Sequence, residues 1–321
     1  MESKEKFRSI IINKEGMYMR DISREELNEI LESHELWLKR EGGKRADLSN
    51  VDLRYANLRC ADLSNIDLSY TDLSYADLSY ANLIGADLSN TNLKGAYLRF
   101  IDLRYANLED TNLRCTNLEY ADLENANLKD TNLRCTNLEN ANLEHADLEN
   151  ADLRVANLSH TDLKYANLRC ANLRCTRLEH ADLENANLVR ADLSDAKLKF
   201  TNLKDIKTNI YTTGYNLACP ETGSFIGYKK ANECLIQLLI LDDSKRSSAT
   251  SVKCRCDKAK VLDIENIKTG EKIKEISSNY DNNFVYEVGK IVSVEDFDED
   301  RWNECSTGIH FFMNKDNAIN Y

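Results

Sequence analysis

The sequence has little proline and no long apolar segment. It contains one proline and 11 glycines in 321 residues, and no apolar run approaches the roughly 20 residues of a membrane-spanning helix. The amino-terminal sequence MESKEKFRSIII lacks the apolar core and the cleavage site of a secretory signal peptide. These absences argue against a membrane or exported protein, and we expect a cytoplasmic chain without a membrane partner.

Motifs for common enzymes and cofactors are also missing. The sequence has no P-loop, dinucleotide-binding fingerprint, zinc-protease motif or nucleophile elbow. Its ten cysteines include no C-x-x-C pair, and the closest two, Cys254 and Cys256, have a spacing that is atypical of zinc ligands. We therefore expect neither a metal nor a cofactor.

What the sequence has instead is a five-residue repeat. Thirty-two consecutive pentapeptides fill residues 46–205, and each has Leu at its third position. The first residue is Ala, Thr, Ile or Val, and the second is almost always Asp or Asn. Self-similarity at a fixed period indicates a stacked solenoid.

The spacing within each pentapeptide predicts where the chain turns. The small first residue and the Leu are two positions apart, so both point to the same side of an extended segment. The next small residue follows the Leu by three positions, so the chain must turn at the fourth and fifth residues to keep both inside. A helix is excluded, because spacings of two and three do not follow a period of 3.6. The second, fourth and fifth residues are expected to face outward.

The A(D/N)LXX run resembles the pentapeptide-repeat proteins. This resemblance covers half of the chain and implies a right-handed quadrilateral β-helix, with four pentapeptides per coil and eight coils over residues 46–205. Its core would be a stack of Leu side chains that runs from Leu48 through Leu123 to Leu203. Five cysteines share the fifth position with Tyr and Asn, which is typical of interchangeable surface residues in a reducing compartment: Cys60, Cys115, Cys135, Cys170 and Cys175.

Residues 1–45 are expected to cap the first coil. Ser23 and Glu26 form a capping box, and apolar residues follow at helical spacing from Leu27 to Leu38. This pattern predicts an amphipathic helix over about residues 24–40, with His34 as a packed residue of the lid rather than a ligand. The sequence IIINK, at residues 10–14, is compatible with a short strand or a loose segment.

Residues 206–321 form a different domain, because the Leu period stops at Asp205. Strand-like runs predict a small, mostly antiparallel β domain with a short helix at 314–320. The predicted strands are 224–229, 235–241, 260–264, 284–288, 290–294 and 309–312. The segments KRSSAT…KCRCDKAKVL and FDEDRWNECSTGIHFF resemble a domain of unknown function that follows pentapeptide repeats and occurs in some phage proteins.

Two places in this domain carry reactive side chains. Cys305 and His310 lie close in sequence, downstream of Asp296, Asp298, Glu299 and Asp300, and a Cys nucleophile with a His base is a known arrangement. A structural cysteine and a hydrogen-bonded histidine explain the same residues without catalysis. Residues 245–248, Lys-Arg-Ser-Ser, are compatible with a phosphate site or with a solvated charged loop. We expect no enzyme.

The net charge of −12 is distributed unevenly. Assigning every fourth pentapeptide to one face gives −5 for the face that begins at Ala46 and −6 for the face that begins at Ala61. The faces that begin at Val51 and Ala56 each have a charge of +1. The candidate interaction residues are Glu124, Glu144 and Glu184 on the Ala61 face and Arg114, Arg134, Arg154 and Arg174 on the Val51 face. These charges favour either simple solubility or a surface that attracts a partner of opposite sign.

Three classes of function follow. The first is a non-catalytic scaffold that binds an unknown protein, with no direct contact to nucleic acid. The second comes from the resemblance, since some pentapeptide-repeat proteins act on DNA gyrase as acidic mimics of a DNA duplex. The third is an undetermined enzymatic activity in residues 206–321. We expect a monomer whose last coil is covered by Ile206, Ile210 and Tyr211 or by the C-terminal domain; a dimer is the alternative.

Overall fold

The structure is a computed structural model that describes residues 18–303 and 306–321, and the expected strand at residues 10–14 lies outside them. The chain divides into two compact units. The first comprises the residues up to Asp192 together with Phe200–Thr212, and the second comprises Leu193–Lys199 and Thr213–Tyr321. Neither helix of the described chain has the length and apolar content that crossing a membrane requires.

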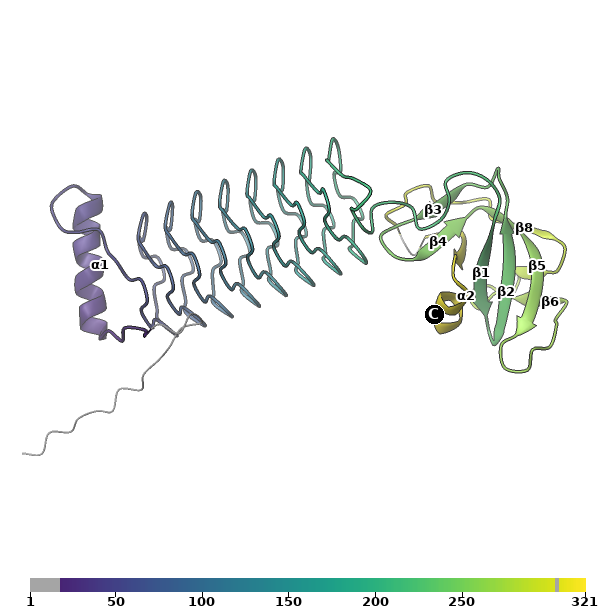
Figure 1. The fold of residues 1–321 in the computed structure, drawn as a ribbon, viewed down its shortest axis with the longest axis horizontal. Helices are drawn as coiled ribbons and strands as arrows, with labels where there is room; N and C mark the ends of the chain where they lie inside the picture. Colours follow the sequence, from purple (N-terminus) through teal and green to yellow (C-terminus); the bar gives the residue numbers. More distant parts are fainter. Residues whose placement is uncertain (1–17, 304–305) are drawn as a thin grey trace, which may run out of the picture. The chain divides into compact units, whose positions relative to one another are not determined.

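The repeats form the predicted β-helix (Figure 1). The second residue of a pentapeptide pairs in parallel with the residue twenty positions later, as in Asp47 with Asp67 and Asp122 with Asn142. Twenty residues therefore make one coil of four pentapeptides, as the resemblance to pentapeptide-repeat proteins implied. The fourth and fifth residues form turns, and the fifth residue has a positive φ, for example 59° at Cys115.

Leucine side chains fill the centre of the β-helix. Every repeat leucine from Leu48 to Leu198 is at most 4 % exposed. Leu203 is only half buried, because the ladder of parallel pairs ends at Lys207 and no further coil covers it. Most first-position threonines are buried with their hydroxyl groups satisfied: Thr111 Oγ1 donates to Leu88 O of the preceding coil at 2.7 Å. Other threonines repeat this bond, whereas Thr116 Oγ1 donates to Leu113 O.

Two expectations about the repeat surface were wrong in detail. The fourth-position serines Ser64, Ser74 and Ser79 are buried although this position was expected to face outward, because their short side chains lie against the turn. Ile210 and Tyr211 do not cover the last coil, since they are 82 % and 60 % exposed.

The helix α1 (Arg24–Leu38) is the predicted lid. Ser23 caps it by accepting a hydrogen bond from Glu26 N. His34 is fully buried and joins the helix to the first coil: Nδ1 accepts from Ala46 N at 3.2 Å, and Nε2 lies 3.0 Å from Ser64 O. Because a carbonyl oxygen can only accept, the proton of the neutral ring is on Nε2.

The C-terminal unit is built on an antiparallel seven-stranded sheet with the order β3-β4-β9-β1-β2-β5-β8. Its strands are β1 (Phe225–Ala231), β2 (Cys234–Ile240), β3 (Arg246–Ser248), β4 (Lys253–Cys256), β5 (Lys258–Asn266), β8 (Ile291–Ser293) and β9 (Ile309–Phe312). A hairpin of β6 (Glu275–Ser277) and β7 (Val285–Glu287) and a short helix α2 (Lys315–Asn320) complete the unit.

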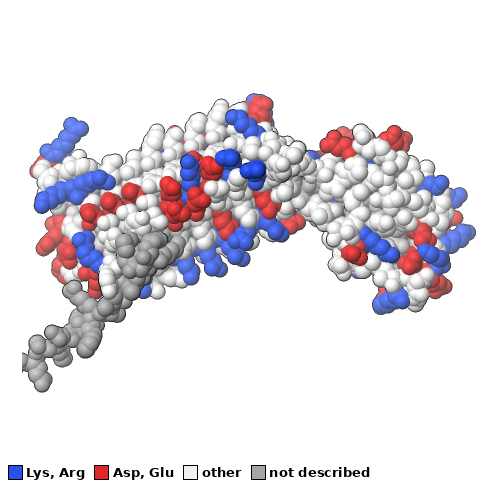
Figure 2. All heavy atoms as spheres, viewed as in Figure 1, with Lys and Arg blue, Asp and Glu red and all other residues white. Residues whose placement is uncertain are grey.

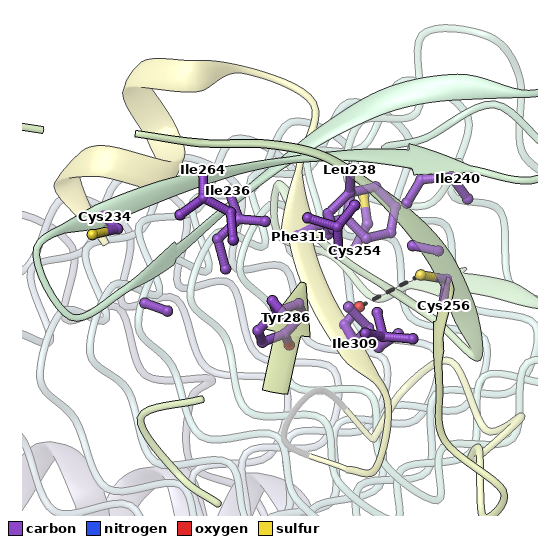
Figure 3. Packing of buried hydrophobic residues seen from close by; sticks show 14 of the residues in the cluster. Cys234, Ile236, Leu238, Ile240, Cys254, Cys256, Ile264, Tyr286, Ile309 and Phe311 are labelled. Carbon is purple, nitrogen blue, oxygen red and sulfur yellow. Dashed lines mark hydrogen bonds between the residues drawn. The ribbon is translucent and has the colours of Figure 1, made fainter. Parts of the chain in front are cut away.

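One apolar cluster forms the core of this unit (Figure 3). Alternate residues of β2, including Ile236 and Leu238, pack with Phe311 of β9 and Tyr286 of β7. Gly227 of β1 leaves room for the ring of Phe311, because a Cβ atom there would lie 2.6 Å from Phe311 Cδ2.

Candidate functional site

The main pocket of the described residues in the C-terminal unit has a volume of about 500 Å³. It lies where β1 and β9 separate, since these strands share only the pair Tyr228–Phe312 among the residues described. Lys229, Lys253 and His310 line it from β1, β4 and β9. The β6–β7 hairpin contributes Phe284 and Tyr286. A charged and an aromatic wall therefore face the same space.

Lys229 lies on the apolar face of β1. Its cross-strand partner is Ile236, and the alternate positions Gly227 and Ala231 pair with Leu238 and Cys234 of the core. Directly opposed residues of an antiparallel pair point to the same face. The ammonium group lies 5.9 Å from the centre of the Tyr286 ring. Burial, and the positive charge of Lys253, lower the pKa of Lys229.

His310 is the only described member of the predicted Cys–His pair, because Cys305 lies outside the described residues. Its Nε2 lies 3.1 Å from Ser306 O, so this nitrogen donates its proton to a main-chain carbonyl. Burial and the charges of Lys253, Lys229 and Arg255 lower the pKa of His310 to about 4, and the imidazole is neutral at pH 7.

The acidic residues upstream of His310 do not orient it. Asp298 accepts hydrogen bonds from Asn303 Nδ2 at 2.8 Å and from Asp300 N at 2.9 Å, which stabilise its own loop. These bonds, together with one from the Ser306 hydroxyl, lower the pKa of Asp298 to about 2. Among the residues that the structure describes, no group of three His, Cys, Asp or Glu side chains could hold a metal ion.

The cations of residues 245–248, which the sequence left open as a phosphate site, contact other parts of the protein. Arg246 and Ser248 begin and end β3, and the Arg246 guanidinium donates to main-chain oxygens, including Gly223 O at 2.8 Å and Leu241 O at 2.7 Å. Lys245 is paired with Glu299. The cations of this segment therefore already have partners.

The repeats carry a second candidate surface. Lys94, Arg114, Arg134, Arg154 and Arg174 occupy the fourth position of consecutive coils on the Val51 face, and we call this column the basic ladder. Arg154 pairs with Asp152 at 2.6 Å. Within the described residues, no ion pair is formed by Arg114, Arg134 or Arg174, whose side chains are exposed.

Some acidic side chains of the repeats pair with cations of the same or a neighbouring coil. Arg104 lies 2.6 Å from Asp102 and 3.5 Å from Asp122, and Lys204 lies 2.5 Å from Glu184. Of the predicted acidic residues, Glu144 lies 3.8 Å from the His145 ring, and the Glu124 carboxylate accepts a hydrogen bond from Asn125 Nδ2. Figure 2 shows acidic side chains gathered in a band along the repeats, with basic side chains beside them.

Stacked aromatic rings on the β-helix were not anticipated from the sequence. Fifth-position rings of successive coils lie face to face, with centroid distances of 4.9 Å for Tyr80–Phe100 and 5.0 Å for Phe100–Tyr120. A sequence pattern could have predicted these stacks. Aromatic residues recur at an interval of twenty, and a coil of four pentapeptides places residues at that interval in one column.

Comparison with protein families assigns both parts of the chain. Models of pentapeptide repeats (8 copies) match residues 46–83, 81–119, 91–130, 136–174 and 171–207. The model of a family of unknown function (DUF5758) matches residues 215–318. Among curated proteins, none matches this chain.

Solved pentapeptide-repeat structures resemble parts of the chain. Rfr23 from the cyanobacterium Cyanothece 51142 is 42 % identical over 28 % of this chain, with a TM-score of 0.28, and this chain spans only 62 % of its length. HetL from Nostoc sp. strain PCC 7120, a protein involved in the regulation of heterocyst differentiation, is 34 % identical over 50 % of this chain and 82 % of its own, with a TM-score of 0.32. QnrB1, a plasmid-mediated fluoroquinolone resistance protein, is 20 % identical over 52 % of this chain and 84 % of its own, with a TM-score of 0.30. From the family models and the coil geometry together, the chain is a pentapeptide-repeat protein that continues into a domain of a family of unknown function.

Proposed function

We propose that this protein is a non-catalytic interaction module whose basic ladder binds an acidic surface of a partner protein. The observation that carries the proposal is a column of exposed cations without counter-charges. Arg114, Arg134 and Arg174 form no ion pair among the described residues, whereas other cations of the repeats do, as Arg104 does with Asp122.

The repulsion between stacked arginines of the basic ladder favours binding of an acidic partner. Successive coils are separated by the strand spacing of about 4.8 Å. This is less than the Debye length of about 8 Å at physiological salt, so the guanidinium groups repel one another. Carboxylates of a partner would relieve this repulsion, and the regular β-helix holds the cations at a constant spacing for them. The net charge of −12 opposes binding to nucleic acid, so we propose a protein as the partner.

We also propose a cytoplasmic location. Cys115, Cys135 and Cys175 lie next to the basic ladder as exposed free thiols. A reducing compartment keeps such thiols unpaired.

The test is capture of partners from a native lysate by the full chain, followed by charge reversal. The first variant combines Arg114→Glu, Arg134→Glu and Arg174→Glu. The control combines Lys268→Glu, Lys274→Glu and Lys290→Glu, which changes the net charge equally but lies in the C-terminal unit. We expect one partner to be lost with the first variant, kept with the control and released by added salt. A partner that both variants retain, or that only Glu124→Lys with Glu144→Lys releases, would contradict the basic ladder.

The wild-type chain and the charge-reversal variants also distinguish partner binding by the basic ladder from mimicry of DNA. A mimic should inhibit DNA gyrase in a supercoiling assay at micromolar concentration, with a potency that decreases as salt increases. Because Arg104, Lys164 and Lys204 interrupt the acidic columns with ion pairs, we expect no inhibition.

A further inference from the structure

Two lysines that form no ion pair among the described residues line the pocket between β1 and β9. Lys229 occupies a position of β1 where Gly227 and Ala231, two residues away on either side, are uncharged and face the core. No hydrogen bond or ion pair to the Lys229 ammonium occurs among the described residues, and the ammonium lies 5.9 Å from the centre of the Tyr286 ring. An apolar side chain would pack at this position with less penalty, since burying an unpaired ammonium is unfavourable.

The second cation of the pocket, Lys253, also forms no ion pair with a carboxylate in the part of the chain that the structure describes. Lys253 Nζ lies 3.3 Å from the Tyr321 hydroxyl and 5.4 Å from the centre of its ring. Asp281 and Asp296 line the same pocket, but neither is among the charges that shift the pKa of Lys229 or of His310. Asp281 instead accepts a hydrogen bond from Asn283 N at 2.9 Å.

The remaining wall is apolar and aromatic. Tyr286 is 2 % exposed, and Phe284 packs against the same core cluster. A volume of about 500 Å³ is within the usual range of small-molecule sites. Sites of this kind combine a few convergent polar groups with an apolar lining. Here the charged and polar lining includes two cations, a neutral imidazole and the carboxylates of Asp281 and Asp296.

We propose that this pocket binds a small organic anion, whose carboxylate or phosphate group is held by Lys229 and Lys253 and whose aromatic body packs against Phe284 and Tyr286. The bound anion supplies the negative charge that Lys229 lacks. The site is independent of the basic ladder, because it is built entirely from residues of the C-terminal unit.

The test is isothermal titration calorimetry of the full chain with four probes: phenyl phosphate, benzoate, inorganic phosphate and benzyl alcohol. We expect phenyl phosphate or benzoate to bind, and inorganic phosphate to bind at least tenfold more weakly. Benzyl alcohol, which has the ring without the charge, should not bind. A preference for phenyl phosphate over benzoate, or the reverse, identifies the acidic group.

Variants then connect the binding to the two lysines. Lys229→Met and Lys253→Met should each weaken binding by roughly tenfold to a hundredfold, as expected for the loss of a hydrogen bond to a charged group. Lys290→Met, in the turn between β7 and β8, should bind like the wild type. Lys229→Met should also raise the melting temperature, because it removes a partly buried charge, whereas a lysine with a structural role would lower it. The proposal is wrong if neither organic anion binds, or if both bind equally well to the wild type and to Lys229→Met.

Discussion

His34 shows how one residue connects an element to the repeats. Both ring nitrogens make hydrogen bonds, to Ala46 N and Ser64 O, and they require the neutral ring. Burial lowers the pKa of His34 below its usual 6.5, although Asp62 opposes this shift and Arg45 favours it. A lowered pKa in the folded state means that the bonds stabilise the fold fully above about pH 6.5 and are lost as the pH falls toward the lower value.

We therefore predict that His34→Gln destabilises the protein at pH 7.5 and much less at pH 5. The loss at pH 7.5 should be about 1–2 kcal/mol, the usual contribution of two hydrogen bonds. Urea unfolding of both proteins at both pH values measures it. Because the other titrating groups are common to both proteins, the difference between them isolates His34. A difference that is equal at the two pH values would show that the ring nitrogens are unimportant.

The fifth position of each pentapeptide provides a second prediction. Val155 has a φ of 61° and is 54 % exposed, and β-branched residues are strained in this left-handed region. Asn tolerates the region, so Val155→Asn should stabilise the protein by about 1 kcal/mol. Asn150 has a φ of 60°. Asn150→Val should therefore destabilise by a similar amount, and thermal unfolding compares the two. The two substitutions must change the stability in opposite directions. If both change it in the same direction, backbone strain is not the cause.

The sequence predicted the inward residues of the repeats well, but it did not reveal the positive φ of the fifth position or the placement of Lys229. Leu and Ala are inward because their spacing is fixed, and that spacing is visible in the letters. The positive φ cannot be read from the sequence, because Tyr, Cys, Phe and His together fill the fifth position more often than Asn does. Lys229 was missed for a related reason. Beside Lys230 it reads as part of a charged surface, and only its pairing with Ile236 places it on the apolar face.

At the scale of the coil, the second-position residues form hydrogen-bonded ladders. Asn127 Nδ2 donates to Asn107 Oδ1 at 2.9 Å, and Asn107 Nδ2 donates to Asp87 Oδ1 at 3.2 Å. The direction is constant, from each coil to the preceding one. An Asp can accept at the bottom of such a ladder but cannot donate, so it interrupts the ladder wherever it occurs. The choice between Asp and Asn therefore has a structural consequence.

This rule predicts opposite effects for exchanges that differ by one atom. Asn127→Asp removes the donor and places a carboxylate beside an acceptor, and it should destabilise the β-helix by about 1 kcal/mol or more. Asp67→Asn is the matched exchange, in a column where Asp47, Asp67 and Asp87 are stacked. It creates a donor toward Asp47, relieves repulsion and should stabilise. Chemical denaturation measures the stability of the two variants. If both are destabilised, the second-position hydrogen bonds do not act as proposed.

The strands of the C-terminal unit show where sequence patterns lose information. β1, β2, β5, β7, β8 and β9 all overlap predicted strands, because their apolar runs are long enough to recognise. β3, β4 and β6 were missed, since the segments RSS, KCRC and EIS are short or charged. β4 exists because it pairs with β9, with Arg255 opposite His310. A partner more than fifty residues away cannot be read from a local pattern.

At the scale of the whole molecule, the last coil depends on residues beyond the repeats. Leu193–Lys199 belongs to the second compact unit rather than to the other coils. Within that unit, Thr250 Oγ1 donates to Ala196 O at 2.6 Å, Asp195 N donates to Thr250 O at 3.3 Å, and Leu193 N donates to Thr213 O at 2.9 Å. The strand edge of this coil is thus paired, and exposed edges are what drive β proteins to associate.

A chain that ends at residue 212 should therefore lose the monomeric state that we predict for the full chain. Truncation removes Thr213 and Thr250, so the main-chain groups of Leu193, Asp195 and Ala196 lose their partners. The coil then has an unpaired strand edge, and a second copy of the chain can supply the missing hydrogen bonds. We expect light scattering to report a dimer or an aggregate for the truncated chain and a monomer for the full one.

Thr250→Val is the matched control for the truncation, because it deletes the hydroxyl bond to Ala196 but keeps the other residues that cover the coil, and it should stay monomeric. A truncated chain that remains monomeric and soluble would mean that residues 206–212 protect the coil alone, and residues 213–321 would then be an independent module.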